Sequence, residues 1–261
     1  METKELIRRF QATFDGTPEW AWPFQPPIPL IGKQYRPGHG LLIYASAENL
    51  SWANNEPIPA RFKNGDAWNR YRVRYEAEGR NSPDFFPDVG IQPVSDGGLL
   101  AAGLFISEKL HLPTHPQSRP FLEKIAVTNW CKFSIRSEKN HDYITVARKL
   151  TSSLPYVVGE LAMLQPAVAM VPKQIWKHPI LSAAMHGASP ETKFIPIPQC
   201  NDTVSNCHLA EFSLQAQILQ AQSAGTPLAK WMAEINREKT WRYMAMLDQL
   251  AYRMRPKKGL Y

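Results

Sequence analysis

The sequence predicts an α/β fold: a three-layer sandwich with a central, mostly parallel four-stranded sheet flanked by helices, plus C-terminal helices. Four short apolar runs predict buried strands, because they are continuous rather than alternating. Helical patterns separate most of these runs, and such alternation is typical of parallel sheets. The 261 residues, 44% of them hydrophobic, supply enough apolar material for one sizeable core. We therefore expect a single domain over 1–261, with strands at 41–44, 125–128, 166–171 and 193–198.

The segments around these strands follow from helical spacing and from proline. Apolar residues at helical spacing predict a helix within 3–14, and the prolines of 18–37 exclude a continuous helix or a central strand, so 1–37 is a helix and a proline-rich wrap. Helices are expected at 96–110 and at 141–164, the latter interrupted near Pro155. Basic and aromatic residues alternate at 70–75, which fits a twisted hairpin or a surface that meets phosphates and bases.

The C-terminal extension, 208–261, is expected to be helical. One helix is predicted around Phe212 to Leu219, and Thr226 with Pro227 forms a cap and first turn for a second helix. The apolar stripe of that second helix runs from Leu228 to Leu250. Its other face is basic, which indicates a solvated surface or an arm that contacts phosphate or a partner.

Charge and cysteine content indicate the class of partner and the compartment. Thirty Lys and Arg face 23 Asp and Glu, a formal net charge of +7, which makes nucleic acid the leading partner class. Cys131, Cys200 and Cys207 form neither a disulfide framework nor a paired metal motif, so a reducing cytoplasm and no metal are expected. A metal site at Cys200, Cys207 and His208 is the alternative, and it lacks a fourth ligand. The charged N-terminus and the absence of a run of ~20 apolar residues predict a soluble protein without a membrane partner.

Polar residues follow three of the four predicted strands. In open α/β sheets the ligand crevice lies beyond the carboxyl ends of the strands, so loops that converge there are where a site belongs. The residues in question are Ser46, Glu48 and Asn49 after the first strand, Asn129 after the second, and Gln199, Asn201 and Asp202 after the fourth.

The order of four segments resembles the uracil-DNA glycosylase superfamily. These segments are "GLLIYASAEN", "IAVTNWCKF", "SSLPYVVGELAMLQPAVAMVPKQIW" and "KFIPIPQCNDTVSN", within roughly 38–210. In that family the loop after the first strand handles the attacking water, an Asn after the second strand reads the base, and a His after a later strand stabilises the leaving base. The resemblance implies a DNA-repair hydrolase that flips a base and cleaves its N-glycosidic bond without a cofactor.

Asn129 matches the base-reading Asn of the family. A carboxamide donates and accepts hydrogen bonds together, so it can read the edge of a flipped pyrimidine. The alternative is that Asn129 caps the turn after its strand. Trp52 or Trp130 is a candidate aromatic face for the base, and either is equally suited to the core.

The other two motifs depart from the family pattern. Ser46 stands at the catalytic position, where an unaided hydroxyl is too weak a base, so Glu48 or Asn49 is expected to position the water. Gln199 stands at the His position and can donate a hydrogen bond to the leaving base, although it cannot titrate. A loop that could probe the duplex follows, with Cys200, Asn201, Asp202 and Asn206.

Two functional classes remain open on these residues. The first is a DNA glycosylase-like enzyme, and the second is a catalytically inactive protein of the same fold that binds nucleic acid or a protein partner. A third interpretation is that the match concerns α/β topology alone, which would imply nothing about chemistry.

Overall fold

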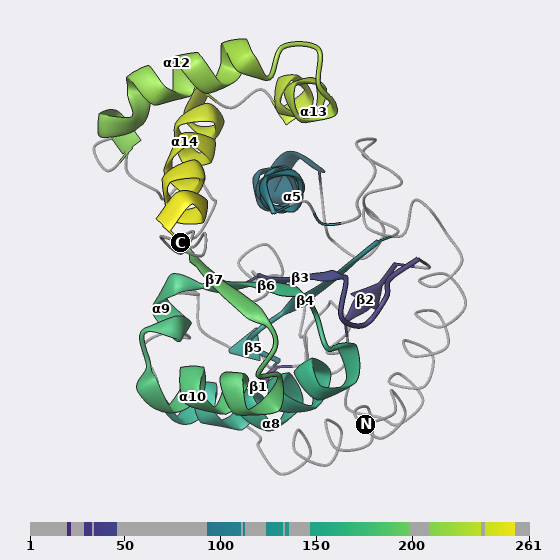
Figure 1. Cartoon of the computed structure of the whole chain (residues 1–261). Helices are drawn as coiled ribbons and strands as arrows, with labels where there is room; N and C mark the ends of the chain where they lie inside the picture. Colours follow the sequence, from purple (N-terminus) through teal and green to yellow (C-terminus); the bar gives the residue numbers. More distant parts are fainter. Residues whose placement is uncertain are drawn as a thin grey trace, which may run out of the picture. The chain divides into compact units, whose positions relative to one another are not determined.

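The computed structural model describes residues 20–21, 29–32, 34–45, 93–110, 112, 124–132, 134–135, 147–198, 209–235 and 238–253 (Figure 1). Contacts group the chain into two compact units. The first, the sheet unit, comprises 1–91 and 123–198, and the second, the helical unit, comprises 92–122 and 199–261. That the two units make one domain, as the sequence predicts, stays a prediction.

Four parallel strands form the centre of the sheet unit, so the predicted α/β class is confirmed. The strand order is β2-β4-β3-β6-β7, in which only β2 is antiparallel to its neighbour. The bounds are β2 (Leu30–Ile31), β3 (Leu41–Ala45), β4 (Ile125–Asn129), β6 (Val168–Pro172) and β7 (Lys193–Ile197).

Each predicted apolar run corresponds to one of the parallel strands, because strands covered on both faces need continuous apolar sequence. Leu41 to Tyr44 of β3 and Val168 to Val171 of β6 are buried. The two edges differ from the centre, since β2 has two residues and β7 contains Pro196. The proline-rich segment adds β2 and β1 (Trp20–Ala21), which pairs antiparallel with β5 (Ser134–Ile135).

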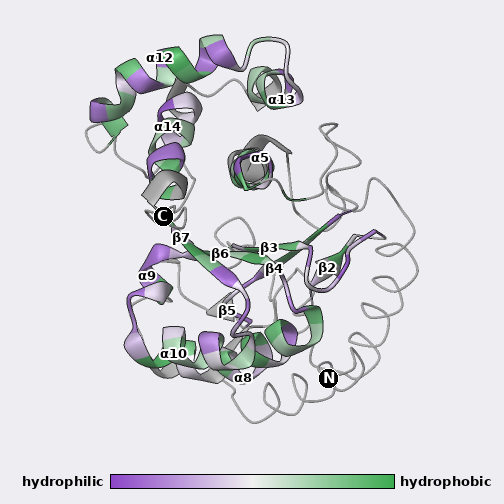
Figure 2. Ribbon diagram, viewed as in Figure 1, coloured by the Kyte–Doolittle hydropathy of each residue, from purple (hydrophilic) through white to green (hydrophobic). Residues whose placement is uncertain are grey.

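Two helices lie side by side on one face of the sheet, α8 (Ala147–Leu164) and α10 (Pro179–Ala188) (Figure 1). The crossovers from β4 to β6 and from β6 to β7 advance in the same direction, and right-handed connections then place both helices on one face. The short helix α9 (Lys173–Trp176) follows β6 directly and is hydrophilic, in contrast to β3 (Figure 2).

Two helical predictions for the sheet unit need correction. The expected interruption near Pro155 is wrong, because α8 continues through this residue. Pro155 is exposed, so the hydrogen bond that proline cannot donate is lost on the solvent side of the helix, where it disturbs packing least. Helix α10 was not predicted, because its apolar pattern is weak. Its buried residues are Leu181 and Met185, while the apolar Ile180 is exposed.

The helical unit consists of α5 (Pro93–Lys109), the 3-10 helix η3 (Ala210–Phe212), α12 (Ser213–Gln222), α13 (Pro227–Ile235) and α14 (Glu238–Arg253). Helices α13 and α14 both contact α5, and α12 contacts α14. The predicted cap is confirmed, because the Ala229 N–H donates to Thr226 Oγ1 over 3.2 Å. The single helix predicted after Thr226 is wrong, since α13 and α14 are separate helices.

No helix within the described ranges is long and apolar enough to cross a membrane. The predictions for 3–14 and 70–75 lie outside the described residues.

Candidate functional site

The carboxyl ends of β3 and β4 meet at one edge of the sheet. Ala45 is in register with Asn129, and the Trp130 N–H donates to the Ala45 carbonyl over 2.8 Å. The chain therefore leaves β3 toward Ser46 directly beside Asn129. From β3 the chain connects to β4 on one side, and from β4 it crosses back to β6 on the other side. The direction of the connections therefore reverses, and the topological switch point lies between β3 and β6. Ligand crevices in such sheets lie outside the carboxyl ends of the strands at this switch point.

Most of the predicted site residues lie outside the described part of the chain. They are Ser46, Glu48, Asn49, Trp52, Gln199, Cys200, Asn201, Asp202 and Asn206, and the alternative metal ligands Cys200, Cys207 and His208 are among the same segments. The strand that precedes Gln199, β7, is separated from β3 by β6.

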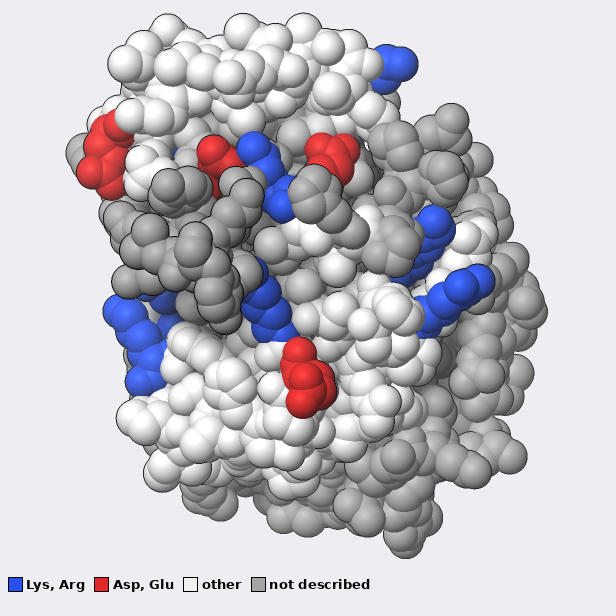
Figure 3. Space-filling model, viewed as in Figure 1, with Lys and Arg blue, Asp and Glu red and all other residues white. Residues whose placement is uncertain are grey.

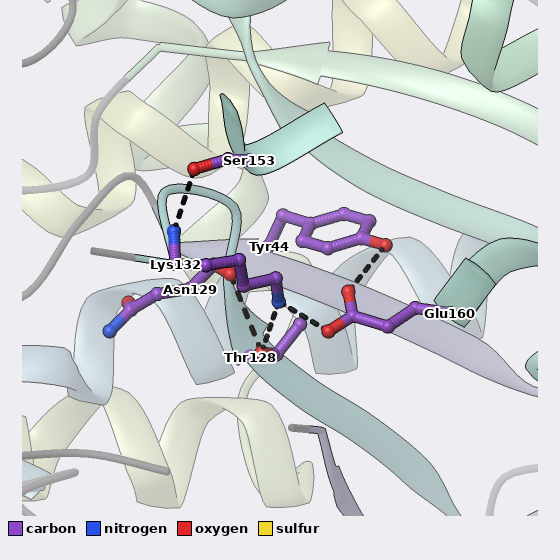
Figure 4. Close-up of polar contacts among 6 residues, drawn as sticks. All are labelled: Tyr44, Thr128, Asn129, Lys132, Ser153 and Glu160. Atoms are coloured by element: carbon purple, nitrogen blue, oxygen red, sulfur yellow. Dashed lines mark hydrogen bonds and ion pairs between the residues drawn. The ribbon is translucent and has the colours of Figure 1, made fainter. Parts of the chain in front are cut away.

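Asn129 is the last residue of β4 and is 8% exposed. Its carboxamide points away from the Lys132 ammonium and from Glu160 (Figure 4). Both predicted roles, base reading and capping of the turn, are compatible with this position.

Trp130 belongs to the core, which is the second of the two roles that the sequence left open for it. Its side chain is fully buried, and its indole Nε1 donates to the Met185 sulfur of α10 over 3.3 Å. The ring thus ties the end of β4 to a helix beneath the sheet.

A buried polar cluster that the sequence analysis missed lies beside Asn129 (Figure 4). The Lys132 ammonium pairs with Oε1 of Glu160 on α8 and donates to Thr128 Oγ1 over 2.9 Å. The Tyr44 hydroxyl of β3 donates to the other carboxylate oxygen, Oε2, over 3.1 Å. The side chains of Lys132 and Glu160 are 0% and 1% exposed, so this is a fully desolvated ion pair.

Burial dominates the electrostatics of this cluster. Loss of solvent raises the pKa of Glu160 and lowers the pKa of Lys132, while each charge opposes the shift of the other. Burial and the Glu160 carboxylate raise the pKa of Tyr44, which remains a neutral donor. Burial also raises the pKa of the Cys131 thiol, which makes this cysteine a structural residue rather than a nucleophile.

The sequence did contain a signal for Glu160. Buried residues of α8 recur at helical spacing, at Tyr156, Val157, Leu161 and Leu164, and Glu160 falls within that apolar stripe. A carboxylate on the buried face of a helix needs a cationic or donor partner. What the pattern does not give is the partner, because Lys132 lies in a different element and well before α8 in the chain.

Within the described residues, no cluster of three or more His, Cys, Asp or Glu side chains could hold a metal ion. No protein-family model matches the chain, and no curated protein or solved structure is significantly similar to it.

Proposed function

We propose that this chain is a DNA glycosylase-like protein that takes an extruded base at the carboxyl edge of its sheet and cleaves the N-glycosidic bond. The observation that carries the proposal is the pairing of Ala45 with Asn129. It sets Ala45, the residue that precedes 46–49 in the chain, next to the residue that, by resemblance, reads the base. Ala45 ends β3, which borders the switch point where α/β sheets bind ligands, and Asn129 ends the neighbouring strand β4.

In this proposal the residues have separate roles. Asn129 donates to and accepts from the edge of the flipped base. Glu48 or Asn49 positions the attacking water, and Gln199 donates a hydrogen bond to the leaving base as negative charge develops on it. These three roles rest on the resemblance and require no cofactor.

The direct test is strand cleavage after alkali treatment. Labelled single- and double-stranded oligonucleotides containing uracil, hypoxanthine, xanthine or a mismatch are incubated with the protein and with the Asn129→Ala variant. Cleavage that the variant loses supports the glycosylase. No cleavage on any substrate excludes glycosylase activity toward these bases and leaves the alternative, an inactive protein of the same fold that binds nucleic acid or a protein partner.

Base reading is tested separately with Asn129→Asp. An amide donor becomes an acceptor, so the preferred base should change. Gln165→Glu is a matched control, because the same amide-to-acid change is made at an exposed residue beyond the end of α8. The same base preference in wild type and Asn129→Asp would remove Asn129 from this role.

Nucleic acid binding is tested by its dependence on salt. Lys173 and Lys177 are exposed, and Figure 3 shows Lys and Arg side chains at several places on one face of the described part of the chain. If they contact phosphates, affinity should fall steeply and log-linearly with salt concentration. A flat salt profile, or no binding at low salt, would exclude nucleic acid as the partner.

A further inference from the structure

The turn that follows β4 is attached to three other elements. The Trp130 N–H donates to the Ala45 carbonyl of β3, and the Trp130 indole donates to Met185 of α10. The Lys132 N–H donates to Ser153 Oγ of α8 over 3.0 Å, and its ammonium pairs with Glu160 of the same helix. Asn129 directly precedes this turn, and it is paired with Ala45 on the neighbouring strand.

The Lys132–Glu160 pair is poorly explained by stability alone. Desolvating two charges costs free energy that their attraction repays only with good geometry, and apolar residues of similar volume often stabilise a core as well or better. Among the described residues, Glu160 Oε1 has no hydrogen bond apart from this ion pair. A buried ion pair can instead enforce one specific conformation of the chain around it, because any other conformation leaves a buried charge unpaired.

The contacts of Lys132 show which part of the chain the ion pair would hold in place. Its side chain folds back from the end of the turn to Thr128 Oγ1, so one ammonium joins the residue before Asn129 to helix α8. The backbone N–H of Lys132 adds the second link to α8 at Ser153. The Lys132 side chain therefore links the two ends of the segment 128–132. The Asn129 carboxamide points away from the Lys132–Glu160 ion pair (Figure 4).

We infer that Lys132 and Glu160 are positioning residues that fix the orientation of Asn129 for base recognition. This inference rests on the proposed function, because it assigns the pair a role in the selectivity of that site. Neither side chain touches the base. They act through Thr128 and through the backbone of the turn.

The test uses Lys132→Met with Glu160→Gln, a double variant that removes both charges and keeps side-chain size. Its matched control is Lys109→Met with Asp248→Asn, which removes the partly exposed ion pair of α5 and α14, whose Nζ and Oδ1 lie 2.9 Å apart. Hydrogen exchange of the Trp130 and Lys132 amides reports on the turn. Discrimination between uracil and cytosine in oligonucleotide binding and excision reports on Asn129.

We expect the double variant to unfold at a urea concentration close to that of wild type, but to exchange the two amides roughly tenfold faster. Base discrimination should fall by roughly tenfold, since misplacing a recognition group by ~1 Å is enough for such losses. The control variant should change neither quantity. A purely structural role of the pair would leave discrimination intact at equal stability.

Each other outcome overturns a defined part of the reasoning. If wild type discriminates between bases and the double variant discriminates equally, the positioning role is wrong and the proposed function stands. Unchanged exchange at Trp130 and Lys132 also refutes the positioning role, whatever the protein binds. If wild type discriminates between no two of the bases used in the cleavage test, the proposed function fails, and faster exchange in the variant then identifies the pair as a folding feature only.

Discussion

The buried pair of Lys132 and Glu160 makes a quantitative prediction about stability. Replacing one partner should destabilise the protein strongly, whereas replacing both should not. We consider Lys132→Met, Glu160→Gln and the double variant, which together form a thermodynamic cycle.

The magnitudes follow from the cost of neutralising an isolated buried charge. The ordinary pKa of lysine is 10.5, so removing the proton from Lys132 at pH 7 in Glu160→Gln costs at most ~4.8 kcal/mol, at ~1.36 kcal/mol per pH unit. The ordinary pKa of glutamate is 4.5, so protonating Glu160 at pH 7 in Lys132→Met costs at most ~3.4 kcal/mol by the same conversion. The double variant carries neither cost and should lie within ~1 kcal/mol of wild type or above it.

The single variants should also depend on pH in opposite directions. In Lys132→Met the folded pKa of Glu160 is raised. The stability contribution of Glu160 is therefore fully present below pH 4.5, and the free energy of unfolding falls as the pH rises. In Glu160→Gln the folded pKa of Lys132 is lowered. The stability contribution of Lys132 is therefore fully present above pH 10.5, and the free energy of unfolding falls as the pH falls. Between pH 5 and pH 8 the two slopes should therefore have opposite signs, each at most ~1.4 kcal/mol per pH unit.

Urea unfolding followed by circular dichroism, at several pH values from 5 to 8, measures these quantities. The pair Lys109 and Asp248 is the control, since its side chains are 32% and 46% exposed and such pairs contribute roughly 0–1 kcal/mol. Additive effects below ~1 kcal/mol in the single variants, with parallel pH profiles, would refute the assignment of Lys132 and Glu160 as a desolvated ion pair.

Three further predictions concern local geometry, each measured by urea unfolding. Gly40→Ala should destabilise by about 1–3 kcal/mol, because the new Cβ would lie 2.3 Å from the Tyr35 ring; no change would mean that the ring moves freely. Gln165→Gly should stabilise by about 0.5–1 kcal/mol, since Gln165 directly follows α8 with φ of 43°, and a loss of stability would contradict this. Thr226→Ala should cost about 1 kcal/mol by removing the cap of α13, whereas Thr226→Ser should retain it.

The sequence predicted the parallel sheet well because its strands are continuous apolar runs, a pattern that buried parallel strands require. It failed where the pattern is weak or shared between elements. The stripe from Leu228 to Leu250 reads as one helix, although two helices carry it. Strands of two residues, such as β2, are too short to show any periodicity.

For the site, the sequence located Asn129 at a strand end, and the register with Ala45 confirms that β3 and β4 end together. It did not reveal the cluster beside it. "WCKF" gives no sign that Lys132 is buried, and its partner on α8 is brought near only by the crossover from β4 to β6. Long-range pairing of this kind depends on the fold and not on local spacing.

The two edges of the sheet bear on how the protein behaves at high concentration. An edge strand offers unpaired N–H and C=O groups to a neighbouring molecule, and this templating is a common start of aggregation. Here one edge is a strand of only two residues, and the other contains Pro196, which cannot donate from its backbone. Among the described residues, neither edge offers a long regular row of donors, so this part of the sheet is a poor template for intermolecular strand pairing.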